Sequence, residues 1–212
     1  MNKAKVGRPR VNGYHRAALI SSARELFIEQ DFDLVSVRKI AKKAGTDPAL
    51  IRYYFGSKLG LFVAMMKETM EPITKVFFKI EENMDINQPK RLMTLYYQTM
   101  AKYPNFPRLV YRLACTSETA KNREVIEVFN ELFEPQEIIF FEVLKRNGLL
   151  GQDVDAQLAR ISFISLLIFP FIMPNLLQSK LGIDITPDFL SKLAAHNTAL
   201  ISHGIMNGNT SK

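Results

Sequence analysis

Residues 36–58, SVRKIAKKAGTDPALIRYYFGSK, are the part of this 212-residue chain that most constrains its fold. Apolar residues in the first half recur at i, i+3, i+4 and i+7, which predicts one face of a short helix. They are Val37, Ile40, Ala41 and Ala44. Ser36 precedes this stripe, where its hydroxyl can cap the amides of the first turn. Gly45 follows it, and glycine tolerates the left-handed conformation that ends many helices.

The second half of the stretch predicts another short helix. Asp47 is a suitable N-cap, and Pro48 fits the first helical position because its missing N–H has no helical partner there. Ile51 and Phe55, four residues apart, form the expected buried face. The expected outward face consists of Ala49, Arg52 and Tyr53. Two short helices around a glycine turn fit the helix-turn-helix, which inserts its second helix into a DNA major groove, although an ordinary helical hairpin has the same spacing.

The net charge of +7 lies entirely in the N-terminal part of the chain. Residues 1–60 contain 12 Lys and Arg against 5 Asp and Glu, whereas residues 61–212 contain 16 of each sign. A basic surface neutralises DNA phosphates, so this asymmetry favours a nucleic-acid role for the helix-turn-helix candidate. A positive region can also be a solvated face, but here it coincides with a separate motif.

Cysteine content and hydropathy indicate the compartment. The single cysteine, Cys115, excludes an internal disulfide framework and a multi-cysteine metal site, and it suits a reducing cytoplasm. We expect Cys115 to pack in the core, with redox sensing as the less common alternative. The longest apolar stretch, residues 161–173, is interrupted by serine and proline and is shorter than the ~20 residues that span a bilayer. The Lys/Arg-rich start lacks the apolar run of a signal peptide, so we expect a cytoplasmic protein without a membrane partner.

Residues 1–12 carry four basic side chains, a glycine and a proline, and have little to bury. They predict a flexible arm that lies in the minor groove beside a recognition helix, or alternatively a disordered solubilising tail. The basic residues of this arm are Lys3, Lys5, Arg8 and Arg10.

The rest of the chain has a helical pattern throughout. We expect a first helix over residues 14–30, and a longer one that Ser57 caps and Pro72 kinks or breaks. Later helices are expected over residues 89–103, 106–117, 121–147, 153–179 and 187–204. No stretch shows sustained two-residue alternation, which predicts an all-α fold. The expected divisions are an arm over residues 1–12, a helix-turn-helix domain over 13–60 and a second domain over 61–212.

The string VRKIAKKAGTDPALIRYYFGSKLGLF, residues 37–62, resembles the N-terminal signature of the TetR/AcrR family of bacterial transcriptional repressors. Together with the preceding helix, the matching stretch covers about a quarter of the chain. The matching residues are Ile40, Ala41, Ala44, Gly45, Leu50 or Ile51, Tyr54, Phe55, Ser57, Lys58 and Leu61. The resemblance implies a three-helix DNA-binding domain followed by a larger helical domain for effector binding and dimerisation.

Three positions depart from the family pattern. Asp31 stands where the family has glycine at the end of the first helix, and aspartate accepts a positive φ better than most residues. Asp47 replaces the capping serine and caps equally well. Arg52 replaces a tyrosine early in the recognition helix.

The resemblance assigns the outward residues to DNA. Arg52 is the expected base reader, because arginine can donate two hydrogen bonds to guanine O6 and N7; a phosphate contact is the alternative. Pro48, Ala49 and Tyr53 are expected beside Arg52, close to base edges, and Ala49 and Leu50 are suited to a thymine methyl group. The hydroxyls of Thr46, Tyr53 and Tyr54 are suited to phosphate oxygens, with packing as the alternative for Tyr54. Ser36, Arg38 and Lys58 are expected to contact phosphate at the starts of their helices. The expected DNA-binding set is Ser36, Arg38, Thr46, Pro48, Ala49, Leu50, Arg52, Tyr53, Tyr54 and Lys58, with the four basic residues of the arm.

The resemblance also implies an effector pocket in the second domain, although aromatic and methionine residues at helical spacing are more often ordinary core. The expected pocket residues are Phe62, Met66, Met100, Tyr103, Arg112, Cys115, Phe129 and Phe133. Arg112 is suited to a carboxylate or phosphate of the effector, or alternatively to a salt bridge with Glu118. The expected two-fold dimer interface comprises Ile161, Ile164, Ile168, Phe171, Ile172 and His196.

These features predict a homodimeric, ligand-responsive repressor that binds a pseudo-palindromic operator in double-stranded DNA and responds to a small, largely apolar effector. A DNA-bound structural or division-control protein without an effector is the alternative. An enzyme or carrier is disfavoured, because the three histidines (residues 15, 196 and 203) are scattered and the sequence has no nucleophile elbow, phosphate loop or metal-ligand cluster. We expect no cofactor and no metal.

Overall fold

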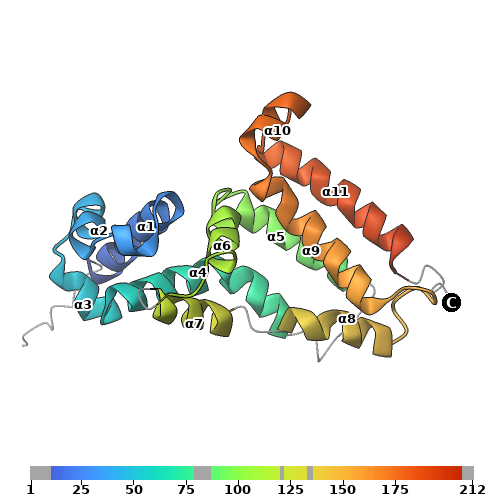
Figure 1. The fold of residues 1–212 in the computed structure, drawn as a ribbon, viewed down its shortest axis with the longest axis horizontal. Coiled ribbons are helices and arrows are strands. Elements are labelled where there is room, and N and C mark those ends of the chain that lie inside the picture. The colour runs from blue at the N-terminus through green and yellow to red at the C-terminus, as the bar shows by residue number, and fades with distance from the viewer. Residues whose placement is uncertain (1–10, 79–86, 120–121, 133–135, 207–212) are drawn as a thin grey trace, which may run out of the picture. The chain divides into compact units, whose positions relative to one another are not determined.

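The computed structural model describes residues 11–78, 87–119, 122–132 and 136–206 (Figure 1). Within these ranges the chain forms eleven α-helices, a short 3-10 helix and no strand, which confirms the all-α prediction. The elements are α1 (Val11–Glu29), η1 (Phe32–Leu34), α2 (Val37–Ala44), α3 (Ala49–Phe55), α4 (Lys58–Phe78), α5 (Gln88–Met100), α6 (Phe106–Ala114), α7 (Arg123–Leu132), α8 (Gln136–Arg146), α9 (Ala156–Ile172), α10 (Asn175–Leu181) and α11 (Pro187–Gly204). An isolated bridge joins Leu150 and Met206.

The described residues divide into two compact units. The first comprises residues up to Glu68 with Glu118–Val125, and the second comprises Thr69–Ser117 and the residues from Ile126 onward. The boundary between Glu68 and Thr69 falls inside α4, so this helix belongs to both units.

The first unit has a small aromatic core around α1. Helices α2 and α3 both pack against α1. The ring of Phe27 lies 5.2 Å from that of Phe62, at right angles to it, and 5.5 Å from that of Phe32, in a stacked arrangement. Edge-to-face and offset ring pairs of this kind stabilise a core beyond the area they bury. This packing fixes the positions of the short helices that follow α1.

The second unit is built around α5 and α9. Helix α5 packs against α11, and α9 packs against α5, α6 and α8. Tyr97 of α5 connects three helices, because its hydroxyl donates to the carbonyl of Leu166 at 2.6 Å and accepts from Asn197 Nδ2 at 2.8 Å. Both Tyr97 and Asn197 are buried, so these bonds satisfy polar groups that water does not reach.

Two of the expected helices are each two helices in the structure. The helix expected over residues 121–147 is α7 and α8, and the one expected over 153–179 is α9 and α10, which meet at 91°. The Met173 amide makes the last hydrogen bond of α9, to the carbonyl of Phe169 at 2.9 Å, and Pro174 has no N–H with which to continue the helix. Both residues have non-helical torsions, with ψ of 131° and 138°. Pro170 lies inside α9, so the helix does not end at this proline. It ends at Ile172, two residues before Pro174.

Smaller differences concern the ends of helices. The first helix begins at Val11, three residues earlier than expected. Helix α4 continues through Pro72 as one element and is not broken there. Asp31 has φ −64°, so the end of α1 needs no positive φ and hence no glycine.

No single described helix is long and apolar enough to span a membrane. Helices α9 and α10 reach the required length and apolar content only when counted together, across their 91° bend.

Candidate DNA-binding surface and effector pocket

Helix α2 begins and ends as its sequence predicts. Ser36 Oγ accepts a hydrogen bond from the Lys39 amide at 3.2 Å, which is the expected N-cap. Gly45 has φ +63°, and the Thr46 amide donates to the carbonyl of Ala41 at 2.9 Å. This left-handed glycine directs the chain from α2 into α3.

Helix α3 presents the expected face to solvent. Asp47 Oδ1 accepts from the Ala49 amide at 2.7 Å, so its carboxylate caps the helix as predicted. Ile51 is buried and Phe55 is half-buried, with the Arg16 guanidinium 5.4 Å from the centre of its ring. Ala49, Arg52 and Tyr53 are exposed, and Tyr53 is 66% exposed although it is a large aromatic residue.

The other expected DNA-binding residues differ in how accessible they are. Ser36, Arg38 and Pro48 are exposed, whereas Leu50 and Tyr54 are half-buried. The Thr46 hydroxyl is buried and has no hydrogen-bond partner among the described residues, so it needs a rotation of its side chain to reach a phosphate. The arm residues Lys3, Lys5, Arg8 and Arg10 lie outside the described residues.

Lys58 makes contacts within the first unit that its predicted phosphate contact does not include. Its Nζ donates to the carbonyls of Phe32 at 2.9 Å and Val35 at 3.0 Å, and it lies 4.1 Å from the centre of the Phe32 ring. Burial lowers the pKa of this ammonium, and the charge of Asp33 partly opposes the shift. These carbonyls take the place of the water molecules that would hydrate an exposed ammonium. The two hydrogen bonds therefore hold η1 against the start of α4.

Helices α2 and α3 carry a strong positive charge. Their basic residues are Arg38, Lys39, Lys42, Lys43 and Arg52. Lys43 forms a 2.8 Å ion pair with Glu25, whose hydrogen bond and charge raise the pKa of the lysine, and Lys39 Nζ donates to Gln30 at 2.6 Å. Arg38 and Arg52 are both exposed, one at the start of α2 and one on the outward face of α3.

The expected effector residues do not gather at one site. Phe62 packs against Phe27 in the core of the first unit, and Met66, Met100 and Phe129 are buried. Tyr103 and Arg112 are half-buried, and Phe133 lies outside the described residues. Glu118, the alternative partner considered for Arg112, forms a 2.9 Å ion pair with Arg123. Cys115 is exposed just after α6 ends, so the expectation that it packs in the core is wrong.

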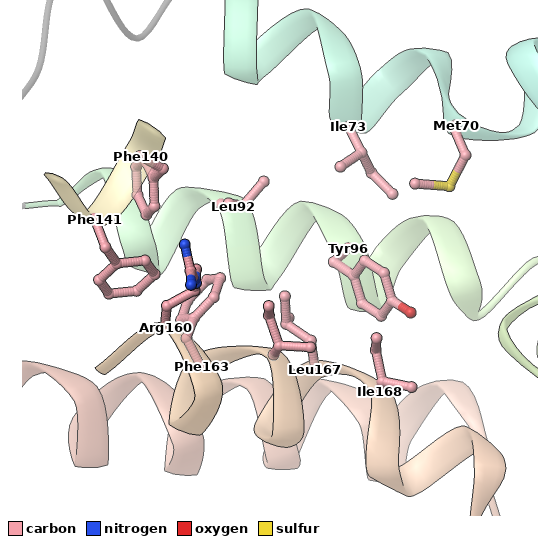
Figure 2. A pocket seen from close by; sticks show the side chains of 11 residues that line it. Met70, Ile73, Leu92, Tyr96, Phe140, Phe141, Arg160, Phe163, Leu167 and Ile168 are labelled. Atoms are coloured by element: carbon pink, nitrogen blue, oxygen red, sulfur yellow. The ribbon is translucent and has the colours of Figure 1, made fainter. Parts of the chain in front are cut away.

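An apolar cavity of about 50 Å³ lies in the second unit, between α4, α5, α8 and α9 (Figure 2). Ten of the eleven residues that line it are aliphatic or aromatic: Met70, Ile73, Leu92, Tyr96, Phe140, Phe141, Phe163, Ile164, Leu167 and Ile168. The eleventh is Arg160. None of the expected effector residues is among these eleven. Arg160 is the one charged residue of α9, and this is the feature by which the sequence could have indicated the cavity. Small-molecule sites usually have such an apolar lining with few polar groups, although their volumes are larger, about 300–1,000 Å³.

A second hollow is an open groove along α5 and α11. Its lining includes Lys90, Lys102 and His203 among small and polar residues. It is more open to solvent than the cavity at α9, and the described chain provides nothing that covers it.

The expected dimer residues point in several directions. Phe171 is only 2% exposed and packs against the rings of Tyr96 and Tyr97, so its expected place in the interface is wrong: it belongs to the core of the second unit. Ile164 and Ile168 line the cavity, and Ile172 is half-buried. Ile161 and His196 are exposed. Sequence periodicity did not separate these directions because α9 is apolar around most of its circumference.

Several large apolar side chains are nevertheless exposed on the last three helices. They are Leu158, Ile161 and Phe169 on α9, Leu176 and Leu181 on α10, and Leu200 on α11. They make up six of the ten large hydrophobic residues that are exposed among the described residues. Exposed apolar residues in such numbers are a feature of surfaces that take part in protein–protein or membrane contacts.

The chain resembles known regulators over both units. Residues 19–65 match the family of bacterial regulatory proteins, tetR family. The chain is 24% identical over 165 residues to the probable HTH-type transcriptional regulator YttP of Bacillus subtilis (strain 168), covering 77% of this chain and 80% of that protein. Its fold is similar to that of the fatty acid degradation regulator FadR from Bacillus halodurans, with a TM-score of 0.63 and 20% identity over 95% of this chain and 98% of that chain.

NalD, the secondary repressor of the MexAB-OprM multidrug efflux pump in Pseudomonas aeruginosa, has a similar fold, with a TM-score of 0.65 and 19% identity over 94% of this chain and 99% of that chain. These relatives are regulators and not enzymes. The match over residues 19–65 includes the capped α2, the Gly45 turn and the exposed face of α3. Residues 19–65 therefore form a helix-turn-helix DNA-binding domain of the TetR type, and the chain as a whole is similar to transcriptional regulators of that family.

Proposed function

We propose that this protein is a cytoplasmic repressor that binds a pseudo-palindromic operator as a homodimer and leaves it when a small, largely apolar effector binds. Residues 13–60 supply the DNA contacts, and residues 61–212 supply the effector site and the dimer interface. The exposed outward face of α3, with Arg52 between Ala49 and Tyr53, is the observation that carries the DNA-binding part. That NalD is a repressor supports repression as the mode of regulation.

The exposed apolar residues of α9 and α11 support dimerisation. A two-fold contact uses the same surface patch on both copies. One apolar face per chain is therefore sufficient, because it packs against the same face of the second copy. Two copies then present two α3 helices, which reach successive major grooves when their centres are about 34–36 Å apart. An operator with two inverted half-sites follows from this symmetry.

The cavity between α4, α5, α8 and α9 is the proposed effector site. Met70 and Ile73 come from α4, the same helix that begins at Lys58 beside η1. An effector larger than the cavity has to displace its walls, and a change in α4 alters the spacing that two α3 helices need. Release requires that the effector bind the DNA-free arrangement more tightly than the DNA-bound one.

The test is selection of DNA from a random pool by the purified full-length protein, followed by titration of the selected sequence and of a scrambled one. We expect a selected sequence with two inverted half-sites, bound at least about 1000-fold more tightly than scrambled DNA. Equal binding of both sequences, with the same salt dependence, contradicts sequence-specific regulation.

A DNA-bound structural protein without an effector remains the alternative to ligand response. Thermal denaturation with a collection of small apolar compounds separates the two, because a ligand that binds only the folded state raises the melting temperature. Specific operator binding without stabilisation by any compound favours the structural protein.

A further inference from the structure

Arg160 is the single charged residue of α9, and its side chain lies in the wall of the apolar cavity. Figure 2 shows it at the end of the cavity where Phe140 and Phe141 lie, whereas Met70 and Ile168 lie at the other end. The residue is half-buried. Among the described residues no hydrogen-bond acceptor or carboxylate partners Arg160, in contrast to Arg108 and Arg123, whose guanidinium groups donate to carbonyl or carboxylate oxygens.

A guanidinium in this position is suited to a bound carboxylate. Its planar donors match the two oxygens of a carboxylate, and the low dielectric of an apolar cavity strengthens the pair. One guanidinium neutralises one negative charge. A phosphate dianion leaves an uncompensated charge in the cavity, and burying such a charge is costly.

We propose that the effector is an apolar carboxylic acid whose carboxylate pairs with Arg160 and whose body lies along α9. This inference rests on the proposed function, since it takes the cavity to be the effector site. Phe163, Leu167 and Ile168 continue the wall from Arg160, and eight residues of helix span about 12 Å. The acid therefore has one ionised end and an extended apolar remainder.

The size of the cavity links this ligand to regulation. Its volume of about 50 Å³ holds about three to five water-sized groups, less than an acid of that length. The acid has to displace lining side chains, and Met70 is well suited to move because methionine is unbranched and flexible. Met70 belongs to α4, so the displacement acts on the helix that starts at the DNA-binding domain.

The experiment measures binding of matched pairs of compounds to the full-length protein by isothermal titration calorimetry. The pairs are octanoic acid with octanamide and phenylacetic acid with phenylacetamide, at pH 7.5. We expect at least one acid to bind 10- to 100-fold more tightly than its amide, which is the range for a hydrogen-bonded charged group. In Arg160→Gln the preference disappears, because the acid weakens to the level of the amide.

Two further variants separate pairing from general charge. Arg146→Gln removes the same charge from an exposed position at the end of α8 and should keep the full preference. Arg160→Lys keeps the positive charge but loses the planar pair of donors of the guanidinium. This variant should keep only part of the preference for the acid over the amide. Thermal melts of all variants verify that each is folded.

Operator titration of the wild type without any compound keeps the two proposals distinguishable. If the wild type binds no operator specifically, the proposed function is wrong. If it binds its operator but Arg160→Gln keeps the acid preference, or no acid binds, or octyl phosphate binds more tightly than octanoic acid, the assignment of Arg160 is wrong while the proposed function stands.

Discussion

Arg52 and Lys58 belong to the same basic stretch but have different surroundings. Arg52 is exposed on the outward face of α3, whereas Lys58 donates to two backbone carbonyls beside the Phe32 ring. The sequence shows equal charges at the two positions. Their surroundings differ because the Lys58 stem is long enough to reach back to η1. The phosphate contact predicted for Lys58 depended on its place at the start of a helix and on family resemblance, and neither of these indicates the contacts with η1.

Arg52→Ala is expected to weaken operator binding by about 10- to 100-fold and to leave binding of scrambled DNA nearly unchanged, because an arginine that grips guanine contributes about 1–3 kcal/mol of discrimination. Fluorescence anisotropy with both DNAs measures the two affinities. A uniform loss on both DNAs shows that Arg52 contacts phosphate and reads no base.

Arg38→Ala is the matched control for that measurement, since it also removes an exposed guanidinium from the same domain. If Arg38 contacts phosphate, its loss weakens both DNAs equally and reduces the slope of log affinity against log salt by about 1. Arg52→Ala is therefore expected to weaken mainly operator binding, whereas Arg38→Ala is expected to weaken binding of operator and scrambled DNA alike.

Tyr97 predicts a loss of stability at alkaline pH. Burial raises the pKa of its hydroxyl to about 12, although the hydrogen bond from Asn197 opposes the shift. The phenol ordinarily ionises near pH 10, so the unfolded chain releases this proton first. The protonated hydroxyl therefore contributes fully to the free energy of unfolding below about pH 10. This contribution, about 3 kcal/mol, disappears as the pH rises to about 12.

Urea unfolding of the wild type and Tyr97→Phe between pH 8 and 12 tests this expectation. At pH 8 the variant should be less stable by about 1–3 kcal/mol, because Leu166 and Asn197 lose their partner. The difference between the two proteins should narrow above pH 10. A constant difference between the wild type and Tyr97→Phe over this pH range contradicts the role of the buried hydroxyl.

At the scale of helices, the local features of residues 36–58 were predictable and the breaks further along were not. Ser36, Gly45 and Asp47 each act on amides or torsions within a few residues, so sequence alone specifies them. The division between α9 and α10 was missed because Pro170 and Pro174 have the same chemistry. Only the packed structure decides which proline stays inside the helix.

Arg108 stabilises that division between α9 and α10. Its guanidinium donates to the carbonyls of Phe171 at 2.7 Å and Met173 at 2.9 Å, and to Asn175 Oδ1 at 2.9 Å. These carbonyls lie at the C-terminus of α9, where a positive charge is favourable. One side chain thus satisfies acceptors on both sides of the 91° bend.

Arg108→Met is expected to lower the free energy of unfolding by about 2–4 kcal/mol, since it removes charged hydrogen bonds and leaves their acceptors unsatisfied. Urea unfolding measures the loss, and hydrogen exchange of residues 173–181 should increase more than that of α5. Arg146→Met, at an exposed position, should change stability by less than about 0.5 kcal/mol. Equal stability of the wild type and Arg108→Met shows that the bend does not depend on this arginine.

At the scale of the whole molecule, the N-terminal helix-turn-helix domain was predictable but the cavity was not. The motif of residues 36–58 and the positive charge of residues 1–60 together predicted DNA binding by the N-terminal part of the chain. The cavity requires α4, α5, α8 and α9 to meet, and residues such as Leu92 and Phe163 have no feature that separates a cavity wall from ordinary core. The charge of Arg160 inside an apolar helix was the one visible sign.

The exposed apolar residues of α9 predict that a single charge prevents dimerisation. Ile161 is 55% exposed, so Ile161→Glu should fold normally as a monomer, while two such charges facing each other across a two-fold axis repel and lose water. Sedimentation velocity at micromolar concentration should then show a monomer. Operator affinity should fall by about 10²- to 10⁴-fold, because two linked half-site contacts become independent. Tyr111→Glu places the same charge at a similarly exposed residue of α6 and should remain a dimer. If Ile161→Glu also remains a dimer, the interface does not include this part of α9, and Leu176 and Leu181 of α10 become the residues that a partner has to cover.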